Sequence, residues 1–125
     1  MPVLQPQVPD LSRDDVAADQ LPADTWAGIA RDLLARGELR LAMRALHLST
    51  LSHLGRQDLI RIARYKTNRD YEIELGRRAH AKPDLLPVFC NNVLLFEGIW
   101  YGAHGVDAGI VQQFADGADR IRSVS

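Results

Sequence analysis

Cysteine is nearly absent from this chain of 125 residues, so no disulfide within the chain can form and folding must depend on packing. No run of 18 apolar residues occurs, which excludes a typical transmembrane helix from the sequence given. The N-terminus lacks the basic start and apolar run of a signal peptide, and none is expected. Charge of one sign is not in excess either, because 15 Lys and Arg face 16 Asp and Glu. A dedicated nucleic-acid-binding protein is normally strongly basic, so this balance argues against one.

The composition and length of the chain are typical of one globular domain. Apolar residues make up 46% and charged residues 25%, and the length is that of a single domain. Residues 1–22 hold four of the six prolines, so we expect an extended or loosely packed arm, with a tail of no role as the alternative. Residues 23–125 are predicted to form the helical domain. Four apolar residues would dock part of the arm, namely Leu4, Val8, Leu11 and Val16.

From residue 24 onward, apolar residues recur every three to four positions, which is the spacing of amphipathic helices. Asp24 is predicted to cap the first helix, which ends at Gly37. The next helix, residues 38–54, is apolar on two faces and is therefore predicted to be central, with its end at Gly55. Its exposed strip is predicted to consist of two residues, Arg40 and Arg44.

The second half of the chain predicts three more helices. Residues 59–65 are consistent with either a strand or a continued helix, and we treat them as a connection. Thr67 with Asp70 has the spacing of a capping box, although aspartate is shorter than the usual glutamate. Asp84 and Asp107 are predicted caps of the last two helices. The strongest periodic stripe comprises Leu85, Phe89, Val93, Phe96 and Trp100. Together these segments predict an all-α fold, a single compact bundle of about five helices with short loops.

Three segments in order carry a resemblance to a known family. They are Gly37–Ala42 before a leucine-rich helix, the run Lys66-Thr67-Asn68-Arg69-Asp70-Tyr71, and the run Phe96-Glu97-Gly98-Ile99-Trp100-Tyr101-Gly102. Over residues 24–123 the chain resembles the bacterial domain of unknown function forty-one twenty-nine. That domain is the C-terminal domain of membrane-bound transglutaminase-like proteins and of related membrane proteins. Pro87 and Gly98 depart from it, since better helix formers are expected at both positions.

The resemblance implies a soluble domain that a preceding transmembrane helix tethers at the cytoplasmic face of the inner membrane. In that setting residues 1–22 would be a juxtamembrane linker. No catalytic activity is established for the family, so it implies no active-site residues here. We therefore expect a non-catalytic accessory or protein-interaction domain, with membrane-associated proteins as partners.

Chemical motifs are scarce. The spacing of His47 and His53 does not align them on one helix face, and the sequence has no Cys-x-x-Cys or His-Glu-x-x-His motif. Cys90 is interpreted as a partly buried structural thiol. The loop Gly102–Gly105 lacks the lysine and hydroxyl residue of a phosphate-binding loop. We accordingly predict no catalytic residues, no cofactor and no metal site.

Charge is unevenly distributed along the chain. Residues 56–82 carry eight basic and four acidic side chains, a net +4 in an otherwise acidic chain. Such a segment suits an acidic partner or weak contact with an anionic membrane surface, whereas the alternative is a solvated face whose bases pair with neighbouring acids. A small helical nucleic-acid-binding module is the second reading, although no nucleic acid is expected. The candidate interaction surface comprises Arg61, Arg64, Lys66, Asn68, Arg69 and Tyr101.

Overall fold

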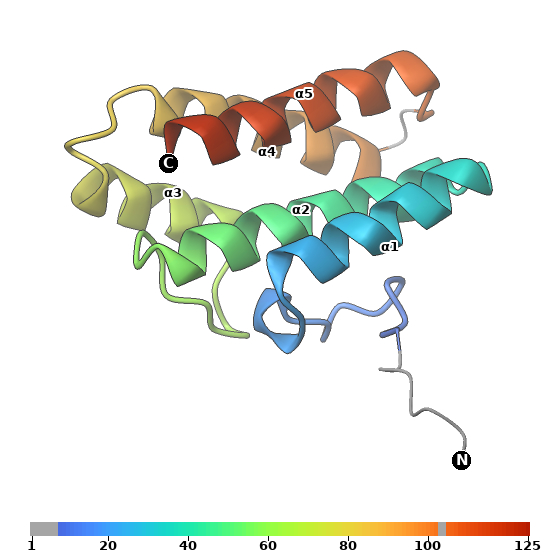
Figure 1. Cartoon of the computed structure of the whole chain (residues 1–125), viewed down its shortest axis with the longest axis horizontal. Helices are drawn as coiled ribbons and strands as arrows, with labels where there is room; N and C mark the ends of the chain where they lie inside the picture. The colour runs from blue at the N-terminus through green and yellow to red at the C-terminus, as the bar shows by residue number, and fades with distance from the viewer. Residues whose placement is uncertain (1–7, 103–104) are drawn as a thin grey trace.

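The computed structural model describes residues 8–102 and 105–125, and every regular element in these ranges is helical. This confirms the prediction of an all-α bundle. Figure 1 shows α1 and α2 as an antiparallel pair, with α4 and α5 packed above them. No helix of these ranges is both long and apolar enough to cross a lipid bilayer. In chain order the elements are η1 (Ala18–Gln20), α1 (Ala23–Ala35), α2 (Leu39–Arg56), α3 (Asn68–Arg78), α4 (Leu85–Trp100) and α5 (Ala108–Val124).

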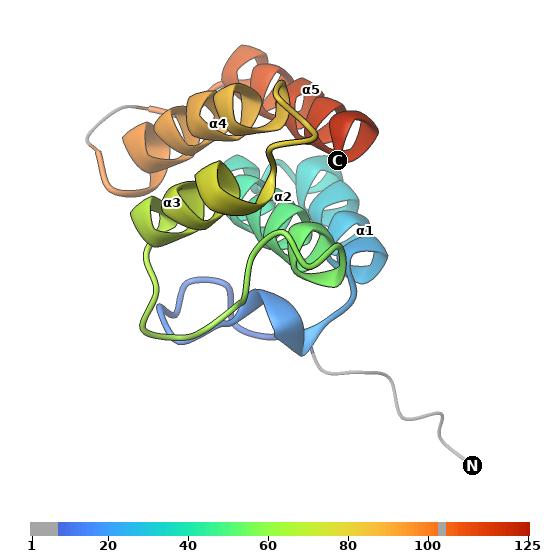
Figure 2. The same ribbon diagram turned by 90° about the vertical axis from the view of Figure 1, so that its left-hand side faces the viewer.

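Helix α2 occupies the centre of the bundle, as its two apolar faces predict. It contacts α1, α4, α5 and η1, whereas α3 lies beyond it and packs on α4 (Figure 2). Arg40 is exposed as predicted, but the prediction for Arg44 is wrong, because only 8% of Arg44 is exposed. The end of α4 and the N-terminal arm cover it, so a charged side chain lies inside the fold.

Three predicted helix ends are confirmed. Gly37 has a φ of +76° and begins the turn after α1, where its N–H donates to the carbonyl of Leu34 at 3.1 Å. Thr67 and Asp70 form both bonds of the capping box at the start of α3. The Asp107 carboxylate accepts a 2.8 Å hydrogen bond from the backbone N–H of Ile110. These local bonds satisfy backbone groups that a helix end otherwise leaves without partners.

Three other predicted ends are corrected. Helix α1 begins at Ala23, so Asp24 is inside it, and the Asp24 carboxylate instead binds Arg122 of α5 at 2.7 Å. Helix α2 continues past Gly55, and the left-handed residue after it is Asp58, with a φ of +58°. Asp84 occupies the N-cap position of α4 but makes no capping hydrogen bond with its side chain.

The predicted stripe of α4 faces the core. All five of its members are buried, and Trp100 retains only 7% exposure. Next in the chain, Tyr101 is 68% exposed, as its position 100° further round the helix predicts. A separate cluster of buried residues joins the start of α2 to the end of α4 and the start of α5: Met43, Phe96, Ile99, Trp100, Val111 and Phe114.

Residues 8–22 and the 57–67 loop lie together below the helices (Figure 2). Leu11 and Ala18 are buried, and the indole N–H of Trp26 donates to the Ala18 carbonyl at 2.8 Å. Val8 is 61% exposed, and Leu4 lies outside the described residues. The 57–67 loop is neither strand nor helix. The arm and this loop therefore form a layer that packs beneath α2.

Candidate functional site

A cavity of about 530 Å³ lies where the arm, α2, the 57–67 loop and the end of α4 meet. Four residues of the candidate interaction surface line it: Arg64, Lys66, Asn68 and Tyr101. Arg61 lines a different cavity, and Arg69 lines neither of the two. We call this first space the Arg44 cavity after the arginine buried in its wall. The fold thus brings four of the six predicted surface residues together at one cavity and places the other two elsewhere.

Arg44 brings a positive charge into the wall of the cavity. Its Nη2 donates to the backbone carbonyl of Arg13 at 3.3 Å, and its guanidinium carbon lies 5.1 Å from the ring centre of Trp100. Its Nε is buried without a hydrogen-bond partner among the described residues. Burial lowers the pKa of Arg44, while Tyr101 and Asp14 oppose that change. An arginine still remains charged at any physiological pH.

His47 forms the inner end of the cavity wall. Its ring stacks on Phe96 with 4.5 Å between ring centres, and its Nε2 is 2.8 Å from Oδ1 of Asn68. Because an amide oxygen can only accept, Nε2 donates this bond. Burial lowers the pKa of His47 to about 4, with the Asn68 bond acting against the shift and Arg44 adding to it. His47 is therefore a packed, neutral histidine that ties α2 to the start of α3.

Lys66 is held at the side of the cavity rather than free on the surface. Its ammonium pairs with Glu74 at 2.9 Å and donates to the Arg61 carbonyl at 2.6 Å. The same glutamate accepts a 2.9 Å bond from the backbone N–H of Arg61. These bonds hold the 57–67 loop against α3. Lys66 therefore stabilises the packing of this loop in addition to lining the cavity.

The remaining cavity wall is mixed in polarity. Leu48, Leu51 and Phe96 lie behind the wall and are almost fully buried, while Asp14, Asp15 and Glu97 supply negative charge. Of the candidate interaction residues at the opening, Arg64 and Tyr101 are exposed, as are the wall residues Asp14, Asp15, Thr67 and Glu97. Tyrosine and arginine are enriched at protein interfaces because each offers a large contact area together with hydrogen-bond donors. The composition suits recognition of another polypeptide better than that of a highly charged ligand.

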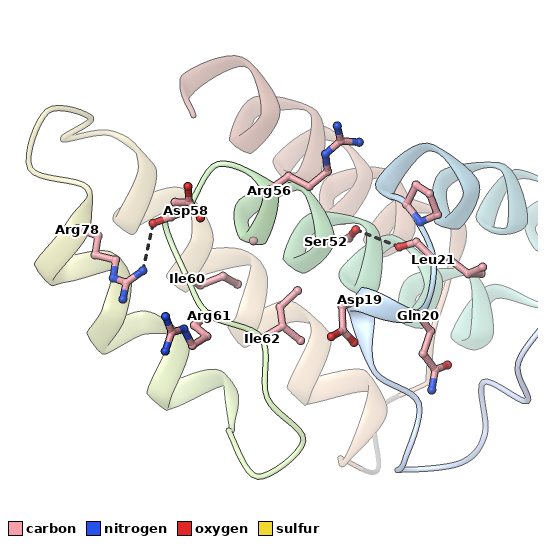
Figure 3. A pocket seen from close by; sticks show the side chains of 12 residues that line it. Asp19, Gln20, Leu21, Ser52, Arg56, Asp58, Ile60, Arg61, Ile62 and Arg78 are labelled. Atoms are coloured by element: carbon pink, nitrogen blue, oxygen red, sulfur yellow. Dashed lines mark hydrogen bonds between the residues drawn. The ribbon is translucent and has the colours of Figure 1, made fainter.

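A second cavity, of about 500 Å³, lies between η1, the end of α2 and the 57–67 loop (Figure 3). Arg61 lines this cavity and, as Figure 3 shows, stands near Ile62 and across from Asp19. The Ser52 hydroxyl donates to the Leu21 carbonyl, and Arg78 donates to the Asp58 carbonyl. These hydrogen bonds link the walls to one another, so the polar groups here stabilise the loop packing.

The described residues offer little for catalysis. Cys90 is partly buried, and burial, followed by Glu72, raises the pKa of its thiol to about 11. A thiol nucleophile acts as the thiolate, which is scarce here at neutral pH. Within residues 8–102 and 105–125, no three His, Cys, Asp or Glu side chains gather in a metal-binding group. His104 of the predicted Gly102–Gly105 loop lies outside the described residues.

Comparison with models of known protein families, with curated proteins and with solved structures finds no match for this chain.

Sequence reasoning missed Arg44 as the central residue of the site. The signal was present, because Arg44, Leu48 and Leu51 stand at positions i, i+4 and i+7 of one helix face. An arginine in line with two leucines on a central helix is a candidate for burial. What covers it could not be deduced, since the covering residues come from the arm and from α4.

Proposed function

We propose that this chain is a non-catalytic protein-interaction domain and that the Arg44 cavity with its rim is the surface that binds the partner. The proposal rests on the position of the cavity at the place where several chain segments meet. Four separate chain segments converge on one opening, with Tyr101 and Arg64 exposed at its edge. Aromatic and arginine side chains around a partly apolar hollow are the usual centre of a protein interface.

The resemblance to the bacterial domain of unknown function forty-one twenty-nine supports a setting for this interaction. In that setting the domain belongs to a larger membrane-anchored protein and acts at the cytoplasmic face of the inner membrane. The partner is then another protein of the same membrane. Two of the three segments that carry the resemblance contribute Asn68 and Tyr101 to the cavity wall.

A capture experiment tests the proposal. The purified domain is immobilised and exposed to detergent-solubilised bacterial membrane proteins, in parallel with the double variant Arg64→Ala/Tyr101→Ala. The matched control is Arg77→Ala/Leu94→Ala, because Arg77 and Leu94 are also exposed but do not line the cavity. We expect a membrane protein that the wild type and the control retain and the cavity variant loses.

The proposal fails if the cavity variant retains the same proteins as the wild type, or if the wild type retains none specifically. Circular dichroism of all three proteins establishes that the substitutions leave the helical fold intact.

A further inference from the structure

We infer that residues 8–16 form a movable strap, which closes one side of the Arg44 cavity and opens while residues 18–22 stay packed on the helices. The inference rests on the proposed function for what the closed strap serves, but the opening itself follows from how the strap is held. The strap supplies Asp14, Asp15 and Val16 to the cavity wall. Its departure therefore leaves the proposed binding site incomplete.

The polar groups of the strap are satisfied mostly by one another. The Asp10 carboxylate accepts from the N–H and the hydroxyl of Ser12 at 3.0 and 2.6 Å, and the Asp10 carbonyl accepts from the N–H of Arg13. Arg13 in turn pairs with Asp15 at 3.0 Å. Among the residues that the structure describes, one hydrogen bond joins the strap to the rest of the chain, from Arg44 to the Arg13 carbonyl at 3.3 Å. The strap can therefore leave α2 with most of its hydrogen bonds intact.

Apolar burial holds the strap at a single point. Leu11 is buried at 5% exposure, whereas the other strap residues are half-buried or exposed. The strap also helps to cover Arg44, and burial of this cation lowers its pKa even though Tyr101 and Asp14 act in the opposite direction. Opening returns Arg44 to water, which offsets part of the cost of exposing Leu11. The closed strap is therefore only weakly favoured over the open one.

Residues 18–22 are held in a different way. The Ala18 carbonyl accepts from the indole N–H of Trp26 at 2.8 Å, and the Leu21 carbonyl accepts from the Ser52 hydroxyl at 3.1 Å. These bonds come from α1 and α2, so breaking them disturbs the helical packing. Segments with few buried apolar contacts open locally, whereas those tied to the core open with the whole domain. The strap therefore hinges just before Ala18.

Trypsin tests the strap in the intact chain, because Arg13 lies inside it and a protease needs several residues of open chain around the bond that it cuts. The measurement is the initial rate of cleavage after Arg13, followed by mass spectrometry and divided by the rate for a free peptide of residues 8–20. This ratio reports the fraction of open strap when opening and closing are fast relative to cleavage. We expect a ratio between about 0.1 and about 0.001, which is typical of local opening. It should depend little on urea below the unfolding transition, since little surface becomes exposed.

Two variants within the strap isolate its anchor. Leu11→Ala should raise the cleavage ratio about ten-fold or more, because it removes most of the buried side chain that holds the strap closed. Val8→Ala is the matched control and should leave the ratio unchanged, since Val8 lies in the same strap but is 61% exposed.

The strap is refuted if cleavage after Arg13 is no faster than cleavage after Arg44 within α2, because cutting α2 requires global unfolding. It is also refuted if Arg13 is cut as fast as in the free peptide, which would mean that residues 8–16 are not docked, or if Leu11→Ala leaves the rate unchanged. None of these outcomes involves a partner, so they are independent of the proposed function.

The protein retained in the capture experiment tests the role of the strap in the site. If only the closed strap binds this partner, the partner at ten times its Kd should slow cleavage after Arg13 about ten-fold. A partner that depends on Arg64 and Tyr101 but does not slow this cleavage would uphold the proposed function and reject the strap as part of the site.

Discussion

The buried histidine His47 makes the stability of the fold depend on pH. Its pKa of about 4 in the folded protein lies below the ordinary value near 6.5. The unfolded chain therefore binds more protons than the folded chain between these two values, and the free energy of unfolding should fall as pH is lowered through this window. The total contribution is about 3 kcal/mol, at 1.36 kcal/mol for each unit of pKa. Urea denaturation of the wild type between pH 7 and pH 4 measures it.

The variant His47→Phe isolates this effect, because it keeps an aromatic ring against Phe96 but cannot titrate. Its free energy of unfolding should depend much less on pH between 4 and 6.5. His53 also has a lowered pKa, so a small slope of the same sign should remain. An unchanged slope in the variant would show that His47 is not the buried neutral group.

Two glycines in helices should respond oppositely to alanine. A Cβ at Gly117 would lie 2.0 Å from Oδ1 of Asn92, whose amide donates to the Phe114 carbonyl at 3.0 Å. Gly117→Ala should therefore displace Asn92 and cost about 1–3 kcal/mol of the free energy of unfolding. Gly98 has open space at the Cβ position, so Gly98→Ala should gain up to about 1 kcal/mol from helix propensity.

Chemical denaturation of both variants gives the comparison directly. A stabilised Gly117→Ala would mean that α4 and α5 are not in the close contact described here.

At the scale of elements, the two N-cap aspartates offer a matched pair. Asp107 accepts a hydrogen bond from Ile110 at the start of α5, whereas Asp84 occupies the same position of α4 without a capping bond. Asp107→Ala should lower the free energy of unfolding by about 1 kcal/mol, which is the usual value of an N-cap. Asp84→Ala should change it by a few tenths at most. Equal losses in the two variants would contradict the difference in capping.

The basic segment that includes the 57–67 loop and α3 carries the membrane prediction. Arg61, Arg64 and Arg69 are exposed, so the domain should sediment weakly with phosphatidylserine vesicles at low salt and less at higher salt. Each of their alanine variants should lose about 1 kcal/mol of binding if that base lies at the lipid surface. Arg36→Ala, at the C-cap of α1, is the control, because α1 lies on the side of α2 away from α3 (Figure 2).

Absence of sedimentation at low salt would contradict this membrane contact. If duplex DNA instead binds at near-physiological salt, the nucleic-acid-binding module becomes the better interpretation, and the salt dependence reports the number of phosphates contacted.

Helix positions were predictable because local signals set them. The stripe of α4, the capping box at Thr67 and the left-handed turn at Gly37 each depend on residues a few positions apart. The ends at Asp24 and Gly55 were wrong because packing decided them. Asp24 is inside α1 and binds Arg122, which is 98 positions away in the sequence, and no local pattern contains that information.

At the scale of the whole molecule, the rim of the site could be predicted from the sequence, whereas the centre of the site could not. Exposed residues such as Arg64 and Tyr101 were predictable from charge and helix geometry. Burial of Arg44 was not, because it requires the arm to fold back under α2 and Trp100 to approach from α4. A site made where four segments meet is visible only after those segments have been placed.

The central claim is that the Arg44 cavity is the surface through which this domain binds its partner. Chemical-shift mapping of the ¹⁵N-labelled domain, titrated with the protein retained in the capture experiment, tests it most directly. The largest amide shifts should fall within residues 14–18, 44–51, 62–68 and 96–101, which contain most of the residues that line the cavity. Shifts confined to the outer faces of α1 and α5, with these four segments unchanged, would contradict it.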